Sequence, residues 1–446
     1  MTGIRQGRIL PSVRLPRDKR RRRCHTARSG SMLAGMTNRV GTMTKFCLVC
    51  SLALGAATLT QGFPSDGQDT APGAENVRFR GEQIASDFGV GYAVATGDVN
   101  GDGATDIVAI SGTDLVWFNA PAPKGSGTSA AWQKQVILSG ATPRDNVCLA
   151  LNDIDRDGKL DVALGASWQP SNTNSGGTLH WVRQGAAGAP WELYSIAEEP
   201  TLHRIRWADV DGDRTRELVV TPLHGRGTKG PEWQGQGARV LVFRPPAKPA
   251  AEPWPMEVAD DTLHILHNFL PVNMDSDPQE ELLTASGEGV NLLERGAKDS
   301  WSRTLVGEGS PGEIKLGRVG GRRLLATVEP WHGKSIVIYA EQPGLWARTV
   351  IESEIAGGHA LGWADFDGDG DEELAAGWRE GKPGVAIYAV DRNGALTSKT
   401  MIDEGGMATE DLVVSDLNGD KRPDIVASGR ATRNVKIYWN ETPGKR

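Results

Sequence analysis

The sequence predicts an all-β fold: a seven-bladed β-propeller with four-stranded blades and calcium-binding loops between the first and second strands of a blade. Two observations carry this prediction. A motif recurs seven times at a mean spacing of 53 residues, and three further apolar runs of strand length lie between successive motifs. Four strands in about fifty residues form one propeller blade, and seven blades close a ring. The 56 glycines and 25 prolines, spread along the chain, agree with many turns between short strands.

Residues 1–62 differ from the rest in charge and hydropathy. They carry 12 Lys or Arg and one acid, Asp18, so they hold +11 of a chain whose net charge is -7, which leaves -18 for residues 63–446. An apolar run over 46–59 follows a basic stretch and ends in small residues. This pattern is typical of a signal peptide and is too short to span a bilayer. We expect an N-terminal extension and signal peptide over 1–62, one propeller over 63–446, and export to the periplasm or the extracellular space.

The acidic charge of residues 63–446 argues against nucleic acid and anionic membranes as partners, and it suits cation binding. Three of the four cysteines lie before residue 63, so Cys148 is alone in the predicted propeller. No internal disulfide is expected there, and the stability of an exported domain would depend on packing and metal ions.

Each motif has two apolar residues, then Asp-x-[Asp/Asn]-x-Asp-Gly-x-x-[Asp/Glu], then an apolar strand. The seven copies start at Asp98, Asp153, Asp209, Asn273, Arg318, Asp365 and Asp416. Oxygen ligands at positions 1, 3, 5 and 9, with glycine at position 6 for a sharp turn, form the kind of cage that Ca²⁺ prefers. The flanking residues alternate and are β-branched rather than helical in pattern, so this loop must join two strands.

The copies differ in completeness. Copies one, two and six are complete, with the predicted ligands Asp98, Asn100, Asp102, Asp106, Asp153, Asp155, Asp157, Asp161, Asp365, Asp367, Asp369 and Glu373. Copies three and seven have Arg214 and Lys421 in place of the glycine, and their predicted ligands are Asp209, Asp211, Asp213, Glu217, Asp416, Asn418, Asp420 and Asp424. Copy four has Pro278 at that position and copy five has no carboxylates, so both are interpreted as polar turns.

The two ends of the repeat region complement each other. The last copy has no fourth apolar run, and an unpaired strand-like segment lies at 76–85. We expect this segment to complete the last blade, which removes two free sheet edges. The motif resembles the FG-GAP or VCBS repeat family over essentially all of 76–446. That resemblance implies a seven-bladed propeller with structural calcium, but it does not imply one function.

Alignment of the blades on one another points to a second site. Six residues before each motif start, where the innermost strand enters the central channel, lie Tyr92, Val147, His203, His267, Gly312, His359 and Glu410. The loop after the second strand is expected on the same face and carries Trp168, His224, Arg226, His332, Lys334, Trp378, Arg379 and Arg430. Five of the seven histidines beyond residue 62 therefore converge on one funnel.

Such a cluster has several interpretations. Imidazoles with a carboxylate suit one Zn²⁺ or Mn²⁺ ion, or a general base beside a charged clamp. A polar, water-filled channel is the alternative. Of the 14 tryptophans, Trp168, Trp331 and Trp378 are placed for a ligand, whereas Trp207 and Trp363 recur within strands and fit the core.

Four segments carry a closer resemblance. They are PTLHRI (200–205), TLHILHNFLPV (262–272), EPWHGKSIVIYAE (329–341) and GGHALGWADFDGDGDEEL (357–374). In order and spacing they resemble the propeller part of the aldos-2-ulose dehydratases, fungal enzymes that dehydrate 1,5-anhydrofructose. The resemblance implies a metal-assisted carbon–oxygen lyase acting on a keto-sugar, with its site in the funnel. His203 matches the proton-transfer histidine, and His264, His267, His332 and His359 match other funnel histidines.

These considerations give a set of assignments. We expect His203 to be the base, the metal ligands to come from His267, His332, His359 and Glu410, and Arg226, Lys334 and Arg379 to clamp a small carbohydrate. The segment PLHGRG (222–227) falls outside the resemblance, so His224 and Arg226 are expected to adapt the site to a different substrate. A non-catalytic propeller that binds a glycan or a protein remains open, as does a polysaccharide lyase of propeller fold, which would release ultraviolet-absorbing products from uronates.

Overall fold

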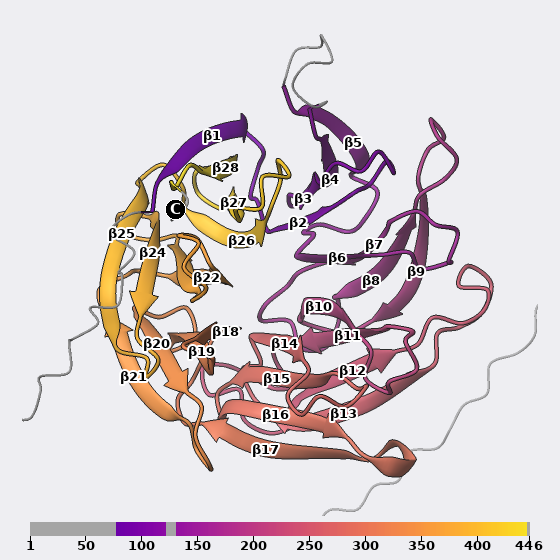
Figure 1. Ribbon diagram of the computed structural model, residues 1–446. Coiled ribbons are helices and arrows are strands. Elements are labelled where there is room, and N and C mark those ends of the chain that lie inside the picture. The colour runs from indigo at the N-terminus through magenta and orange to yellow at the C-terminus, as the bar shows by residue number, and fades with distance from the viewer. Residues whose placement is uncertain (1–76, 122–130, 444–446) are drawn as a thin grey trace, which may run out of the picture. The chain divides into compact units, whose positions relative to one another are not determined.

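The computed structural model describes residues 77–121 and 131–443, all within one compact unit, Gln68–Arg446 (Figure 1). The predicted signal peptide and N-terminal extension lie outside the described residues. In the described part of the chain, no helix has the length and apolar character needed to cross a membrane.

The described residues form seven antiparallel sheets of four strands, which confirms the predicted seven-bladed all-β architecture. Blades one and two contain β2 (Ala93–Gly97), β3 (Asp106–Ile110), β4 (Asp114–Asn119), β5 (Gln133–Ser139), β6 (Cys148–Asn152), β7 (Asp161–Ala166), β8 (Thr178–Arg183) and β9 (Glu192–Glu198). Blades three and four contain β10 (Leu202–Ala208), β11 (Glu217–Pro222), β12 (Ala238–Phe243), β13 (Met256–Leu263), β14 (Asn268–Val272), β15 (Glu281–Ser286), β16 (Gly289–Arg295) and β17 (Trp301–Gly307). A short 3-10 helix, η2 (Ala297–Asp299), joins β16 to β17.

The remaining three blades follow the same order. Blades five and six contain β18 (Glu313–Val319), β19 (Arg322–Glu329), β20 (Ser335–Ala340), β21 (Ala347–Glu352), β22 (Gly358–Ala364), β23 (Glu373–Trp378), β24 (Gly384–Val390) and β25 (Leu396–Glu404). Blade seven contains β26 (Thr409–Ser415), β27 (Asp424–Gly429), β28 (Val435–Asn440) and, as its outermost strand, β1 (Phe79–Ala85).

The ring closes without a covalent link. β1 pairs antiparallel with β28, with Phe79 opposite Asn440 and Gln83 opposite Lys436. Each innermost strand contacts the innermost strand of the next blade, and β26 contacts β2 to complete the circle (Figure 1). Because β28 then has a partner strand on each side, β27 and β1, it is not an exposed sheet edge.

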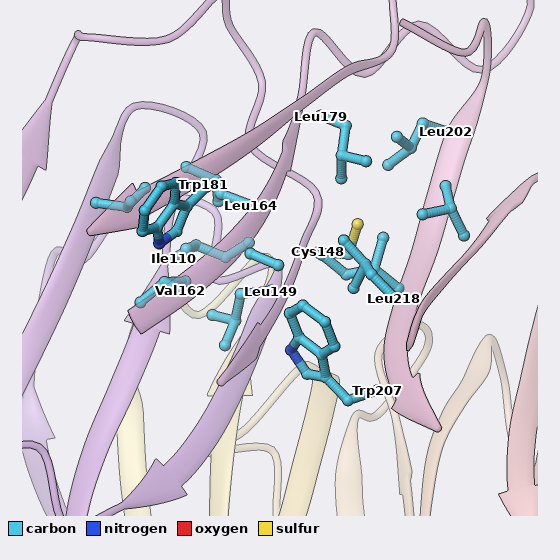
Figure 2. Close-up of a cluster of buried hydrophobic side chains, with 14 of the residues drawn as sticks. Ile110, Cys148, Leu149, Val162, Leu164, Leu179, Trp181, Leu202, Trp207 and Leu218 are labelled. Carbon is cyan, nitrogen blue, oxygen red and sulfur yellow. The ribbon is translucent and has the colours of Figure 1, made fainter. Parts of the chain in front are cut away.

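The core lies between neighbouring blades. In six of the seven blades the second strand is buried along its whole length, as in β3, β7 and β23, because the adjacent blades cover both of its faces. Figure 2 shows such a cluster in the first three blades, where Cys148 and Leu149 of β6 lie among Leu164, Trp207 and Leu218. Each fully buried aliphatic side chain contributes roughly 1.5–3 kcal/mol. This packing fixes the innermost strands. The predicted funnel residues lie where these strands begin, and the acidic loops lie where they end.

Candidate functional site

The innermost strands of three blades begin with an irregularity at the predicted funnel residue. In β10, His203 is the extra residue between Leu202 and Arg204. The register shifts in the same way at His359 in β22 and at Glu410 in β26. A β-bulge redirects side chains and is common next to binding sites. The bulges therefore explain how side chains at the strand entrances are aimed at the axis of the ring.

Four imidazoles lie against one another at this end of the ring. The ring centroid of His267 is 4.5 Å from that of His203, 4.4 Å from that of His332 and 5.3 Å from that of His359. The rings of His332 and His359 are 4.8 Å apart. His203, His267 and His359 are buried and His332 is half-buried. His267 is thus the centre of the cluster, in contact with the other three rings.

Backbone carbonyls fix three of these rings. Nδ1 of His203 lies 2.8 Å from the carbonyl oxygen of His267, whose own Nδ1 lies 2.5 Å from the Gly312 carbonyl oxygen. Nδ1 of His359 bonds the carbonyl oxygen of Glu410. Since a carbonyl only accepts, each Nδ1 donates, and each neutral ring keeps a lone pair on Nε2. Metal-binding histidines are commonly held in this way.

His332 is held differently. Its Nδ1 lies 3.1 Å from Nη2 of Arg379, and a guanidinium only donates, so this Nδ1 accepts. The neutral ring then carries its proton on Nε2, which donates to Nε2 of His267 at 2.5 Å. His267, His332 and His359 each offer a ligand atom within 4.8 Å of the other two, and so they fit a site for one metal ion. His267 and His359 already have the tautomer that leaves Nε2 without a proton, although Nε2 of His267 accepts the hydrogen bond from His332, which would first have to exchange its own bonds.

Glu410, the fourth predicted ligand, belongs to an ion-pair network. Its carboxylate pairs with Arg379 at 2.5 Å and with Arg430 at 2.7 Å. Its Oε1 lies 4.0 Å from Nε2 of His359. In this geometry Glu410 anchors two guanidinium groups beside the histidines, and it neutralises part of their charge.

Burial lowers the pKa of all four clustered histidines. For His332 the pKa falls to about 3, chiefly through loss of hydration and then through the positive charge of Arg379. For His203, His267 and His359 desolvation again dominates and places the pKa well below the ordinary range. The rings are therefore neutral at pH 7, which is the form required of a metal ligand or of a general base.

The cluster opens into a pocket of about 160 Å³, here called the funnel pocket, which is lined by His203, His332, His359, Trp168, Trp331 and Arg379, among others. Trp168 packs against His203 with ring centroids 4.8 Å apart, and Trp331 stacks on His332 at 4.9 Å. Apolar faces beside a few convergent polar groups are typical of small-molecule sites.

Two predicted clamps lie elsewhere. Arg226 pairs at 2.5 Å with the buried carboxylate of Glu199, which also binds Arg239. Lys334 is exposed in the loop after β19. Neither lines the funnel pocket, so Arg379 is the predicted clamp that the structure brings to the histidines.

Other predicted residues are also separated from the cluster. His224 stacks on Trp233, with centroids 3.7 Å apart, and His264 pairs with Glu288 at 2.7 Å. Trp378 is buried and donates from Nε1 to the carbonyl oxygen of Lys382. Four of the five histidines expected in the funnel therefore meet there.

Arg204 is the residue of the site that sequence reasoning missed. Its side chain lines the funnel pocket and donates from Nη1 to Nε2 of His203 at 3.1 Å. The available signal was its place directly after His203 in the Leu-His-Arg-Ile segment. On a regular strand neighbouring side chains point to opposite faces, and only the bulge at His203 changes this alternation.

The acidic loops lie at the opposite ends of the innermost strands. In copy six, the Asp365 carboxylate accepts hydrogen bonds from the backbone N–H groups of Gly368, Asp369 and Gly370 at 2.7–3.0 Å. Glu373, at position 9, is buried and accepts from the N–H of Phe366. Desolvation raises the pKa of Glu373 to about 8. A buried carboxylate of this kind is costly unless a cation or a donor compensates it.

Four copies bring three carboxylates within 4.8 Å of one another. The groups are Asp153, Asp155 and Asp161; Asp209, Asp211 and Glu217; Asp275, Asp277 and Glu281; and Asp365, Asp367 and Glu373. Copy four, interpreted above as a polar turn, thus has its acids gathered like those of its neighbours. In copies two and three an arginine already pairs with the carboxylate at position 3, Arg183 with Asp155 and Arg244 with Asp211, each at 2.5 Å.

Known protein families match different parts of this chain, some with acidic loops and one with the histidine cluster. Residues 98–164 and 365–427 match the FG-GAP-like repeat. Residues 176–342 match the β-propeller domain of aldos-2-ulose dehydratase, and this segment contains His203, His267 and His332. The matches confirm both families. The dehydratase match ends before the segment 357–374 with His359, and it includes 222–227, which was expected to fall outside the resemblance. A solved structure described as the basis of specific recognition of non-reducing terminal N-acetylglucosamine by an Agrocybe aegerita lectin is 11% identical, covers 69% of this chain and 79% of its own, and has a TM-score of 0.45. So low a score supports no argument about this chain.

Proposed function

We propose that this protein is an exported, metal-assisted carbon–oxygen lyase, a dehydratase or eliminase that acts on a keto-sugar in the funnel pocket. The proposal rests on the cluster of four neutral histidines beneath Trp168 and Trp331. Three of these histidines lie in the segment that matches the dehydratase propeller.

His267 and His359 would hold the metal ion, Zn²⁺ or Mn²⁺, with His332 as the third ligand once Arg379 has left its Nδ1. A metal ion bound there would polarise the carbonyl oxygen of the substrate and so acidify the neighbouring C–H.

His203 would take that proton. Its neutral ring keeps a lone pair on Nε2, and Arg204 must move off this atom before the proton can be accepted. The electron pair of the broken C–H bond forms a C=C bond, and the bond between the β-carbon and its hydroxyl breaks. The hydroxide and the proton leave as water, so the reaction needs no oxidant or reductant.

Arg379 and Arg430 would stabilise negative charge on the substrate oxygen. Both guanidinium groups line the funnel pocket and are positioned by the buried carboxylate of Glu410. Donors fixed in advance stabilise developing charge without reorganising during the reaction.

Calcium in the acidic loops completes the proposal. The carboxylates of copies one, two, three, six and seven would bind Ca²⁺ and stabilise the blades rather than take part in the reaction. Backbone N–H groups already hold the first aspartate of these loops, as they do Asp98 and Asp416.

The test measures dehydration of 1,5-anhydrofructose by the full chain loaded with Zn²⁺ or Mn²⁺. His203→Gln should lower turnover by at least about 100-fold, the usual contribution of a general base. His264→Gln is the matched control, because His264 pairs with Glu288 and does not line the funnel pocket. Full turnover in His203→Gln would overturn the proposal. Sugar binding without turnover in the wild type would favour a glycan-binding propeller.

A further inference from the structure

A second and larger cavity, of about 440 Å³, lies beyond the histidines. We call it the central cavity. Residues of six innermost strands line it, β2, β6, β10, β14, β18 and β26, so it follows the axis of the ring. It adjoins the funnel pocket at Tyr92, Val147 and Arg204, which line both. Its far end reaches Arg216 and Glu280, beside the acidic loops.

Positive charge gathers in this cavity, although the chain as a whole is acidic. Arg204, Arg206 and Lys315 all line it. Nζ of Lys315 pairs with Glu313 at 3.1 Å. Arg206 donates to Oδ1 of Asn268 at 2.7 Å, and its guanidinium carbon lies 5.2 Å from the ring centre of Phe269.

The two arginines have carboxylates near them, Glu313 and Asp411, but neither lies within ion-pair distance. Among residues 77–121 and 131–443, neither Arg204 nor Arg206 forms an ion pair. The Asp411 carboxylate also lines the cavity, but it accepts from the backbone N–H groups of Val94 and Leu412, each at 3.0 Å. Like charges held close together away from water repel, so an anion between them would be stabilising.

The size and walls of the cavity define the class of anion. Small-molecule pockets have volumes of roughly 300–1,000 Å³, and this cavity falls within that range. Aliphatic side chains such as Leu149, Leu151 and Val413 line the wall, which suits a carbon skeleton rather than a bare ion. Arginine presents its N–H donors in a planar fork that matches the two oxygens of a carboxylate.

We propose that the central cavity binds a small organic acid of about monosaccharide size, with its carboxylate held by Arg204 and Arg206. Lys315 would add charge from β18, and the aliphatic side chains would cover the carbon skeleton. This site shares Arg204 with the proposed lyase site, where Arg204 bonds His203, but its occupancy is measured as binding and not as turnover.

Calorimetric titration of the full chain with D-glucuronate, and separately with inorganic phosphate, tests the proposal. Glucuronate should bind, and Arg206→Gln should weaken its binding by at least tenfold. Arg206→Lys keeps the positive charge but loses the planar guanidinium, so its affinity for glucuronate should lie between those of the wild type and Arg206→Gln. Arg318→Gln is the control, since it makes the same change in charge at an exposed position of the innermost strand β18 and should leave binding unchanged.

A funnel variant locates the ligand. His359→Asn should bind glucuronate as the wild type does, and a loss confined to this variant would place the acid in the funnel pocket and overturn the proposal. Binding of phosphate alone, or of neither anion, would also overturn it. If Arg206→Gln does not fold, Lys315→Gln takes its place, with weaker glucuronate binding expected and unchanged binding counting against the site.

Discussion

The two ends of the innermost strands differ in how they use the seven-fold repeat. At one end the acidic loops are built alike, with a first carboxylate closed by backbone N–H groups and a buried acid at position 9, as Asp98 and Asp106 show. At the other end the blades contribute unlike residues, including His203, His359 and Glu410. Repetition serves stability, since each loop ties down its own blade, whereas a binding site needs different groups that converge.

The largest effect should come from the centre of the histidine cluster. His267→Asn removes the ring that touches the other three and one of the three histidines that could hold a metal ion. We expect lyase turnover to fall by at least about 100-fold and the bound transition metal to be lost. The measurements are steady-state turnover and elemental analysis of the purified chain.

His180→Asn is the matched control for this prediction. His180 is a buried histidine on β8 that bonds Thr178 and lies outside the funnel pocket. If both variants lost turnover equally, the loss would reflect general destabilisation. The assignment of turnover to the histidine cluster would then be wrong.

The acidic end should show the opposite behaviour. Asp365→Asn weakens the loop of copy six and should reduce stabilisation by calcium, which amounts to about 2.7 kcal/mol for a site at 100 times its Kd. Turnover at 25 °C should change little. Melting curves with calcium and with a chelator measure this difference.

Asp275→Asn, in copy four, provides the comparison within the acidic end. Copy four gathers its carboxylates but begins with Asn273 and has Pro278 in place of the glycine, so the effect of this change should be smaller. A melting temperature that does not respond to calcium in the wild type would remove the proposed role of these loops.

The sequence predicted the acidic loops better than it predicted the residues of the histidine cluster. Seven blades could be counted because the acidic motif is local and periodic, and the entrance position of His203 and His359 followed from aligning the copies. The pairing of Arg226 with Glu199 could not be foreseen, because the two residues meet only in the fold. Arg204 was missed because a bulge, which has no sequence signature, changes the direction of its side chain.

A pH effect should come from His224, which lies outside the histidine cluster. His224 is buried against Trp233, and desolvation lowers its pKa from 6.5 to about 4. Below pH 6.5 the unfolded chain takes up this proton and the folded chain does not, so stability is full above pH 6.5 and declines towards pH 4. His224→Phe keeps an aromatic ring on Trp233 and should reduce the proton uptake on unfolding by up to about one. Denaturation series between pH 7 and pH 4 measure this slope, and an unchanged slope in the variant would contradict the assignment.

The smallest effect is expected at Cys148, in the core between the acidic loops and the histidine cluster. Cys148 lies on β6 within the core shown in Figure 2, where burial raises the pKa of its thiol to about 12. Because the thiolate is the reactive form, iodoacetamide at pH 8 should leave Cys148 unmodified in the folded chain and alkylate it fully in denaturant. Peptide mapping separates Cys148 from the three cysteines before residue 63. Labelling that rises after calcium is removed would show that the acidic end also governs opening of the core between blades, whereas unchanged labelling would confine its influence to the loops.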